Sequence, residues 1–251
     1  MKTVKYISFD DKSGYSIAAE NLISSLKQAG ATVHWTRVTS ATACEPASVA
    51  QIMEGYENVI IHTVPEYYPA WVQFERNGRT SAGKIWGHTT WETDKIPRHW
   101  PDLLNIMDGI LVPCRWNKDV FMQCGVKTRM EVLPHISQFS GRTLDVLPSP
   151  EMRKLREKIG ERYVFYNIGV WSERKAPQIL IEAFLSEFGA DEPVVLIMKT
   201  GQHDHENYRR KWSRPWVFTP GLAADAFKKV TKTRKSGPEI IHLHEDMSDD
   251  D

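Results

Sequence analysis

The sequence of 251 residues lacks the features that mark several large classes of protein. Its three cysteines, Cys44, Cys114 and Cys124, have neither the even number of a disulfide framework nor the spacing of a metal site. It has no apolar run of about 18 residues, the length that a membrane-spanning helix needs, and no apolar stretch of signal-peptide length near Met1. We therefore expect a cytoplasmic protein without a transmembrane segment.

An excess of charge of one sign is also missing, since Lys+Arg and Asp+Glu both number 32. This balance argues against a nucleic-acid coat and against strong attraction to a membrane surface. Basic residues do gather between Gly201 and Glu239, where nine Lys or Arg stand against four Asp or Glu. That segment is interpreted either as a solvated helical face or as a surface for an anion, and no stable nucleic-acid partner is expected.

Several catalytic motifs are absent too. The chain has no G-x-G-x-x-G and no G-x-S-x-G, and D-x-D occurs only within the acidic run Asp249-Asp250-Asp251 at the end of the sequence. His203, Asp204 and His205, and separately His242 and His244, are of the right type for metal ligands but do not form a preorganised set of three or four. We expect neither a metal nor a bound cofactor.

What the sequence does contain is an alternation of short apolar runs with helical patterns, which is typical of β-α-β units and a parallel sheet. Apolar runs predict strands at 4–9, 32–35, 58–63, 84–87, 109–112, 129–133, 163–168, 194–198 and 240–243. Helical spacing predicts helices at 17–30, 47–53, 117–123, 151–159, 177–188, 206–212 and 223–233.

The pattern breaks between Leu133 and Pro150, where prolines and Gly141 interrupt it. We therefore predict an α/β protein of two Rossmann-like doubly wound domains, residues 1–135 and 151–251, joined by a linker at 136–150. The second domain would have 101 residues, fewer than the roughly 150 of such domains. Because the sequence ends where a further helix would begin, this domain is expected to be incomplete.

Three segments follow one another in an order that resembles a known family. They are residues 91–100 (WETDKIPRHW), the short strand 108–113 (DGILVP) and the turn Pro134-His135. This order resembles the retaining GT-B glycosyltransferases of group 1, similar to family 4. The resemblance implies two Rossmann-like domains, a nucleotide diphosphate sugar held between them, retention of anomeric configuration and no metal requirement. Residues 1–135 would then form the acceptor-side domain and residues 151–251 part of the nucleotide-sugar domain.

Polar residues follow the predicted strands of the first domain at the ends where ligands bind in doubly wound folds. Gly14 lies at a strand-to-helix turn, where free N–H groups suit a phosphate, although a simple tight turn explains it equally well. His62 and His88 each end an apolar strand, and Glu92 follows His88 closely. A structural role for a histidine at a strand end is the alternative interpretation. His135 is interpreted first as a hinge residue.

The resemblance assigns roles to these residues. His88 and Glu92 correspond to the loop that contacts donor sugar and acceptor, and are predicted to be catalytic. Tyr15, His62 and Trp91 are predicted on the acceptor side. The segment around Gly14 is similar to the glycine loop of the family, so Gly14 is predicted to bind the donor diphosphate.

Two adjacent cations, Arg174 and Lys175, lie between a predicted strand and a helix that begins at Pro177. Cations beside a helix N-terminus suit a diphosphate, and a solvated turn is the alternative. The segment resembles the G-R-x-x-x-x-K-G loop of the family, with Lys175 aligned and Val170 in place of the arginine, for which Arg174 would substitute. Lys175 is predicted to be catalytic, stabilising charge on the departing diphosphate, with Arg174 and Lys199 as further diphosphate ligands.

The predicted function is therefore a hexosyltransferase-type glycosyltransferase. Its partners would be a nucleotide sugar and a glycan, lipid or other small acceptor, with the oligomeric state left open. One alternative is a truncated or degenerate GT-B protein that binds nucleotide or glycan without catalysis. Two others are a nucleotide-sugar epimerase and a polynucleotide-modifying transferase.

Overall fold

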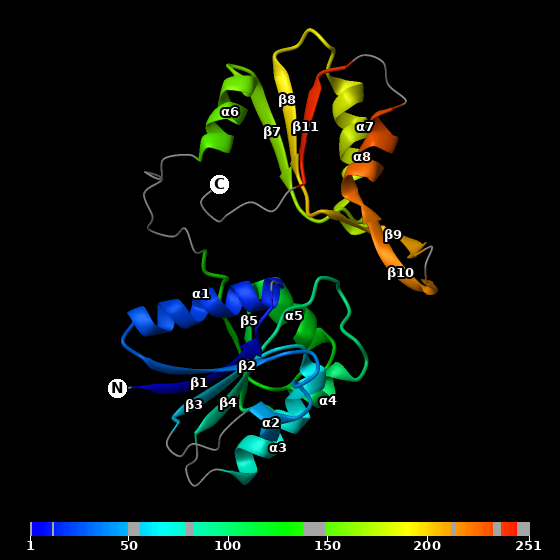
Figure 1. Ribbon diagram of the computed structural model, residues 1–251. Coiled ribbons are helices and arrows are strands. Elements are labelled where there is room, and N and C mark those ends of the chain that lie inside the picture. The colour runs from blue at the N-terminus through cyan, green and yellow to red at the C-terminus, as the bar shows by residue number, and fades with distance from the viewer. Residues whose placement is uncertain are drawn as a thin grey trace. The chain divides into compact units, whose positions relative to one another are not determined.

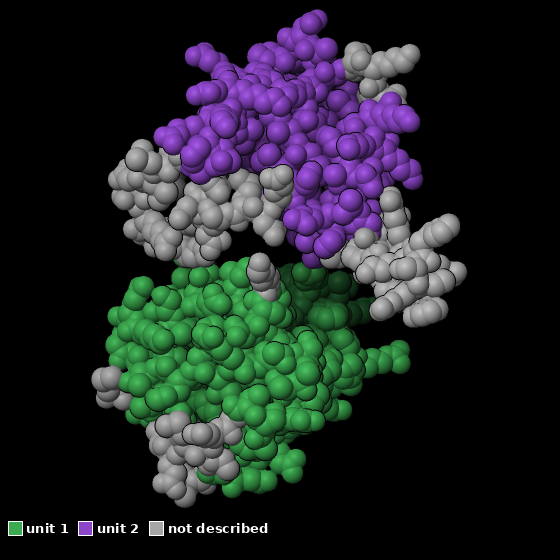
Figure 2. Space-filling model, viewed as in Figure 1, with its two compact units in different colours: residues 1–142 green, residues 143–251 purple. Residues whose placement is uncertain are grey.

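The computed structural model describes residues 2–11, 13–49, 56–78, 83–137, 149–211, 214–232 and 237–244, with backbone alone for 205–211 and 214–220. The chain forms two compact units, unit 1 (residues 1–142) and unit 2 (residues 143–251), shown in Figure 1 and coloured separately in Figure 2. The division falls within residues 136–150, the predicted linker, of which 138–148 lie outside the described residues. The predicted start of a further helix, at 245–251, also lies outside them.

Unit 1 is built on a six-stranded parallel sheet in the order β2-β1-β3-β4-β5-β6. Its strands coincide with the predicted ones to within a few residues, which confirms the prediction from apolar runs. They are β1 (Thr3–Phe9), β2 (Thr32–Val38), β3 (Asn58–His62), β4 (Lys84–His88), β5 (Gly109–Val112) and β6 (Met130–Val132).

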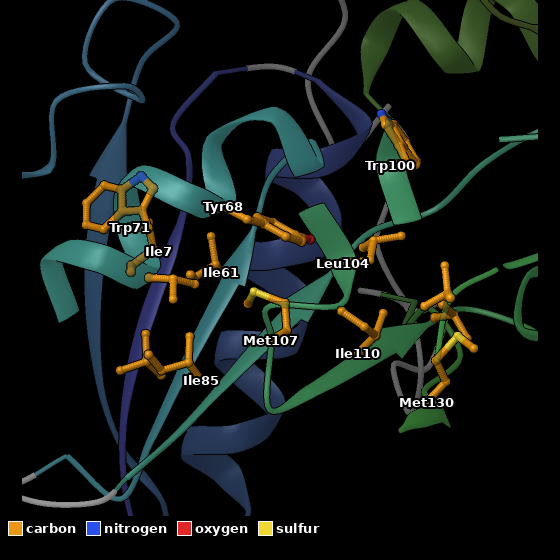
Figure 3. Packing of buried hydrophobic residues seen from close by; sticks show 14 of the residues in the cluster. Ile7, Ile61, Tyr68, Trp71, Ile85, Trp100, Leu104, Met107, Ile110 and Met130 are labelled. Atoms are coloured by element: carbon orange, nitrogen blue, oxygen red, sulfur yellow. The ribbon is translucent and has the colours of Figure 1, made fainter. Parts of the chain in front are cut away.

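Helices cover both faces of this sheet (Figure 1). On one face α1 packs Ala19, Leu22 and Ile23 against β1 and β3. On the other, α3, α4 and α5 bury the larger cluster shown in Figure 3. The helical elements are α1 (Gly14–Gln28), α2 (Pro46–Val49), the 3-10 helix η1 (Pro65–Tyr67), α3 (Tyr68–Asn77), α4 (Trp100–Leu104) and α5 (Arg115–Gln123). α3 and α4 are not among the predicted helices.

The winding of the sheet reverses at β1. β2 lies on one side of β1, whereas β3 to β6 follow on the other, and the connecting helices α1 and α3 consequently lie on opposite faces. In doubly wound sheets the carboxyl ends of the strands at such a reversal form the crevice where ligands bind. In unit 1 that place is the end of β1 and β3, which directs attention to the residues following Phe9 and His62.

A buried ion pair ties α3 to the centre of the sheet. Lys5 points to the α3 face of β1, and its Nζ lies 2.6 Å from Oε1 of Glu75. Both residues are almost fully buried, at 3% and 5% exposure. Since each charge has lost its hydration, each depends on the other for compensation.

Unit 2 contains a three-stranded parallel sheet in the order β11-β8-β7. α7 and α8 cover one face of it (Figure 1), where Trp171, Ile181, Phe184 and Leu196 are buried together. The described strands wind in one direction, as half of a doubly wound sheet does. The elements are α6 (Pro150–Ile159), β7 (Tyr163–Ile168), η2 (Glu173–Lys175), α7 (Pro177–Glu187), β8 (Val194–Lys199), α8 (Ala223–Thr231) and β11 (Glu239–Leu243).

β7 forms an edge of this sheet among the described strands. It exposes large apolar side chains, with Tyr166 75% and Ile168 72% accessible. It carries neither the charges nor the proline that usually protect an edge strand. Within the described part of the chain no helix is long and apolar enough to cross a membrane.

The predicted helix at 206–212 is wrong. The chain there forms β9 (His203–Lys211), which pairs antiparallel with β10 (Arg214–Leu222). The sequence of β9 has no apolar stripe at helical spacing, and the run Trp216-Val217-Phe218-Thr219 that follows has high β propensity. Pairing with this run decides the structure of β9.

We predict that Glu75→Gln destabilises unit 1 by about 3–5 kcal/mol, because it leaves the Lys5 ammonium group buried without a counter-charge. The double variant Lys5→Met/Glu75→Leu should recover most of this loss, since no charge remains buried. Chemical denaturation, with hydrogen exchange of the β1 and β3 peptides as the readout, would measure this change in the free energy of unfolding. Asp10→Asn, at the exposed pair with Arg37, is the control and should cost less than about 1 kcal/mol. Equal effects of Glu75→Gln and Asp10→Asn would contradict the prediction.

Candidate functional site

Two histidines meet at the carboxyl ends of β3 and β4. The parallel register places His62 directly beside His88. Their rings stack with centroids 3.9 Å apart and an angle of 19° between planes. Both are buried, at 2% and 3% exposure. Two predicted site residues, 26 positions apart in the sequence, thus form a stacked pair next to the point where the winding of the sheet reverses.

Tyr6 of β1 contacts the ring of His62 and fixes its orientation. The Tyr6 hydroxyl lies 2.8 Å from Nδ1 of His62, and the two rings meet edge to face. Burial lowers the pKa of His62 well below its usual value, and the neighbouring His88 and His135 lower it further. The imidazole is therefore neutral at physiological pH, with its orientation fixed by a residue of the neighbouring strand.

His88 differs from His62 because neither of its ring nitrogens has a hydrogen-bond partner among the described residues. Burial lowers the pKa of His88 to about 4, with a smaller contribution from His135. His135 itself is exposed, and its ring centroid lies 6.5 Å from that of His88. A buried polar group without a partner is costly, so a hydrogen bond from a ligand to His88 would relieve that cost.

The turn after β1 approaches this pair through Tyr15. The Tyr15 ring lies 5.4 Å from the His62 ring, and its hydroxyl lies 3.0 Å from Oγ1 of Thr89. Gly14 is the first residue of α1, and a Cβ there would meet nothing within 4 Å. The Ser13 side chain accepts from the Ser16 N–H and the Asp11 side chain from the Ser13 N–H. These two N–H groups are thus already satisfied, and diphosphate binding at Gly14 stays a prediction.

A pocket of about 310 Å³ lies in unit 1 over the loop that follows β4. It brings together Tyr15, Trp91 and Glu92, which the sequence analysis placed in the site, with Trp100, which it did not. The lining consists of Tyr15, Val64, Thr90, Trp91, Glu92, Thr93 and Trp100.

The loop that carries Trp91 and Glu92 is held in place by α5. The buried side chain of Asn117 donates to the backbone carbonyl of Trp91 at 2.6 Å and accepts from the Thr90 hydroxyl at 3.0 Å. The indole N–H of Trp91 donates to the Thr93 hydroxyl and to the backbone carbonyl of Lys95. The exposed Glu92 side chain consequently projects from a fixed backbone.

Trp100 is fixed from the other side. Its indole N–H donates to Oε1 of Glu66 at 2.7 Å, and His99 Nε2 lies 3.0 Å from the same oxygen. These hydrogen bonds outweigh partial burial and lower the pKa of the Glu66 carboxyl group. Glu66 lies on η1, so the element that follows β3 positions an aromatic wall of the pocket.

In unit 2 the predicted cations lie on η2, directly before α7. Arg174 and Lys175 are both exposed. Within the described part of the chain, the Lys175 ammonium group makes no hydrogen bond or ion pair, and its aliphatic stem lies 3.8 Å from where a Cβ of Gly169 would be. α7 begins without a side-chain cap and without an acidic residue in its first turn. The positive end of the helix and the two cations therefore reinforce one another.

Ala176, between η2 and α7, has a left-handed backbone with φ 49° and ψ 43°. Residues with a Cβ rarely adopt this conformation, which costs about 1–2 kcal/mol. Lys199, the secondary candidate, ends β8 half-buried, and its Nζ donates to the Thr200 carbonyl at 3.0 Å. Among the described residues no group of three or more His, Cys, Asp or Glu is arranged to hold a metal ion.

Four residues that support this site were not predicted from the sequence: Tyr6, Thr89, Asn117 and Trp100. Tyr6 lies inside an apolar strand, where its hydroxyl gives no pattern that would predict a partner 56 positions away. Asn117 lies in the first turn of the amphipathic helix α5, where the sequence pattern makes it resemble a surface residue. Trp100 is the one with a signal, since it ends the aromatic loop 91–100 in which Trp91 and Glu92 were found.

No protein-family model and no curated protein matches this sequence. Solved structures do match. A trehalose-6-phosphate synthase, OtsA, aligns with 100% of this chain and 75% of its own, at a TM-score of 0.59 and 10% identity. MnaA of S. aureus, solved with UDP, aligns with 97% of this chain and 68% of its own, at a TM-score of 0.53 and 9% identity. At such identities the likeness shows the fold, and it confirms the α/β GT-B architecture.

We predict that His88→Gln reduces the pH dependence of stability between pH 6.5 and 4. In this range the unfolded state binds a proton at His88 and the folded state does not, so folding stability is present above pH 6.5 and falls as the pH drops towards 4. The His88 contribution is roughly 3 kcal/mol. Unfolding free energies at pH 7 and pH 5 would measure it, with His34→Gln as an exposed control. An unchanged pH slope in His88→Gln would contradict the buried neutral imidazole.

We predict that Ala176→Gly stabilises unit 2 by roughly 0.5–1 kcal/mol, because glycine adopts the left-handed conformation without the Cβ clash. The same change at Ala183, an exposed position inside α7, should destabilise by a similar amount. Thermal unfolding of the two variants gives the comparison. A loss of stability in Ala176→Gly would show that the left-handed backbone is not a source of strain.

Proposed function

We propose that this protein is a glycosyltransferase that moves a sugar from a nucleotide diphosphate sugar to an acceptor, with retention of anomeric configuration. The observation that carries the proposal is His88. It is buried and neutral, its ring nitrogens have no hydrogen-bond partner among the described residues, and it lies at the carboxyl edge of a doubly wound sheet near a pocket with Glu92. Two fold neighbours support it by their names, since one is a sugar-phosphate synthase and the other was solved with UDP.

Unit 2 would bind the donor diphosphate. Arg174 and Lys175 stand before the uncapped N-terminus of α7, which has no acidic side chain in its first turn, and the two cations outnumber the one carboxylate of η2, Glu173. Negative charge grows on the diphosphate as the glycosidic bond breaks. Fixed cations stabilise that charge more in the transition state than in the ground state, which is how they accelerate the reaction. Lys199, half-buried at the end of β8, would add to this positive charge.

Unit 1 would bind the sugar and the acceptor. A neutral imidazole both donates and accepts a hydrogen bond, so His88 suits a sugar hydroxyl, while His62 and Tyr6 fix its surroundings. Glu92, on the loop held by Asn117, would orient the acceptor hydroxyl. A same-face attack assisted by the leaving diphosphate needs no protein nucleophile, and we propose that the reaction proceeds in this way, without a metal, in the cytoplasm.

The second candidate is a protein that binds nucleotide or glycan without turning it over. Val170 favours this binding protein, because the exposed valine stands where the group 1 GT-B glycosyltransferases, which the segment resembles, have an arginine for the diphosphate. Binding would then rest on Lys175 and the helix N-terminus, with less stabilisation of the departing group.

We predict that Lys175→Ala lowers donor turnover on the order of 100-fold, the usual cost of removing one preorganised charge-stabilising group. Isothermal titration with UDP, GDP and ADP first identifies the base, and hydrolysis of the corresponding nucleotide sugars then measures turnover. Lys154→Ala, on the exposed face of α6, should change neither binding nor rate.

Nucleotide binding without hydrolysis or transfer of any donor would support the binding protein and overturn the enzyme. Turnover that is untouched in Lys175→Ala would show that the charge on the departing group is stabilised elsewhere.

A further inference from the structure

The aromatic pocket of unit 1 differs from an ordinary sugar site in the state of its polar groups. Proteins usually recognise a polyhydroxylated ring through several hydrogen-bonding groups that the ligand satisfies. In this pocket the polar groups of the aromatic side chains already make hydrogen bonds within the protein. The Tyr15 hydroxyl pairs with Thr89, the Trp91 N–H with Thr93 and Lys95, and the Trp100 N–H with Glu66.

The two threonines of the lining are also occupied. The Thr90 hydroxyl donates to Oδ1 of Asn117 at 3.0 Å. The Thr93 hydroxyl donates to the carbonyl of Lys95 at 3.0 Å and accepts from Trp91 at 2.8 Å. A ligand would therefore meet ring faces and methyl groups rather than free side-chain donors, so burying several hydroxyl groups of its own here would cost free energy that the Glu92 carboxylate alone does not offset.

The charge of the lining residues also affects which ligands the pocket can bind. Of the seven described residues that line the pocket, Glu92 carries the formal charge, and it is exposed. A carboxylate at the rim disfavours an anion in the pocket. An ion of either sign also loses hydration in an apolar pocket, and because water screens the exposed Glu92, its attraction does not repay a cation for that loss.

The shape suits a single ring or a short branched chain. Trp100 is 3% exposed and packs edge to face against Trp91, with centroids 4.7 Å apart, so that the two indoles form a corner. A volume of about 310 Å³ is at the small end of ligand sites. Tyr15 lines this corner and also touches the His62 ring, so the apolar corner adjoins the histidine pair.

We propose that this pocket binds a neutral, apolar group. The acceptor would then be an alcohol whose carbon skeleton is apolar, rather than a free sugar or an anionic lipid headgroup. The role of this group as the acceptor rests on the proposed function. The preference of the pocket for a neutral apolar group is inferred from the contacts of the lining residues alone.

The test is a set of four probes titrated into the full chain and followed by NMR. Benzyl alcohol is the neutral apolar probe, benzoate its anionic counterpart, benzyltrimethylammonium its cationic counterpart, and glucose the polar neutral one. Benzyl alcohol should bind at least tenfold more tightly than glucose and than benzoate. Intermolecular NOEs from its ring to the indole protons of Trp91 and Trp100 should locate it without any substitution.

Val64→Trp fills the pocket and should weaken benzyl alcohol binding at least tenfold, while Val49→Trp, the same change at an exposed position on α2, should leave it unchanged. Equal binding of glucose and benzyl alcohol, tightest binding of the ammonium probe, or NOEs to other residues would each overturn the proposal.

The two proposals fail in different ways. Benzyl alcohol bound at Trp91 and Trp100 in a protein that turns over no nucleotide sugar would keep the pocket assignment and overturn the glycosyltransferase. Donor turnover in a protein that does not bind benzyl alcohol would keep the enzyme and overturn the apolar acceptor.

Discussion

The parallel pairing of β3 with β4 is the constraint on which the candidate site depends. Its register sets His62 against His88 at the edge of the sheet, and burial then keeps both imidazoles neutral. A slip of β4 by one residue against β3 would turn His88 to the opposite face of the sheet from His62. The hydrophobic residues behind them, Ile60 and Ile61 in β3 and Ile85 in β4, oppose such a slip because they are buried on fixed faces.

The two units divide the chemistry between them. Unit 1 presents neutral imidazoles, aromatic rings and a carboxylate, none of which favours a diphosphate. Unit 2 presents exposed cations before an uncapped helix, which favours one. In the proposed reaction, the acceptor on unit 1 and the phosphorylated leaving group on unit 2 would need opposite environments, and this division would meet that need. It also explains why a balanced net charge says little about the sites of this protein.

Much of the fold was predictable, since the strands of both sheets are apolar runs bounded by turn residues and their alternation with helices implies parallel pairing. The helix expected at 206–212 was wrong, because the structure of β9 is decided by β10 rather than by its own periodicity. α3 was missed although its first residues, Tyr68 and Trp71, are fully buried. Their rings pack on a sheet face whose existence no local pattern reveals. His62, His88, Trp91 and Glu92 could be predicted as candidates because they end or closely follow recognisable strands.

The sequence by itself determined which side chains stand at the ends of strands, because an apolar run fixes where a buried strand stops. It also placed the two adjacent cations of η2 before a helix. Only the tertiary structure decided that Tyr6 supports His62, that His88 has no hydrogen-bond partner within the described ranges, and that the side-chain donors around the Trp91–Trp100 corner are already satisfied. These properties arise from pairs of atoms far apart in the chain. Hydrogen bonding and desolvation depend on distances in space, which spacing along a sequence does not contain.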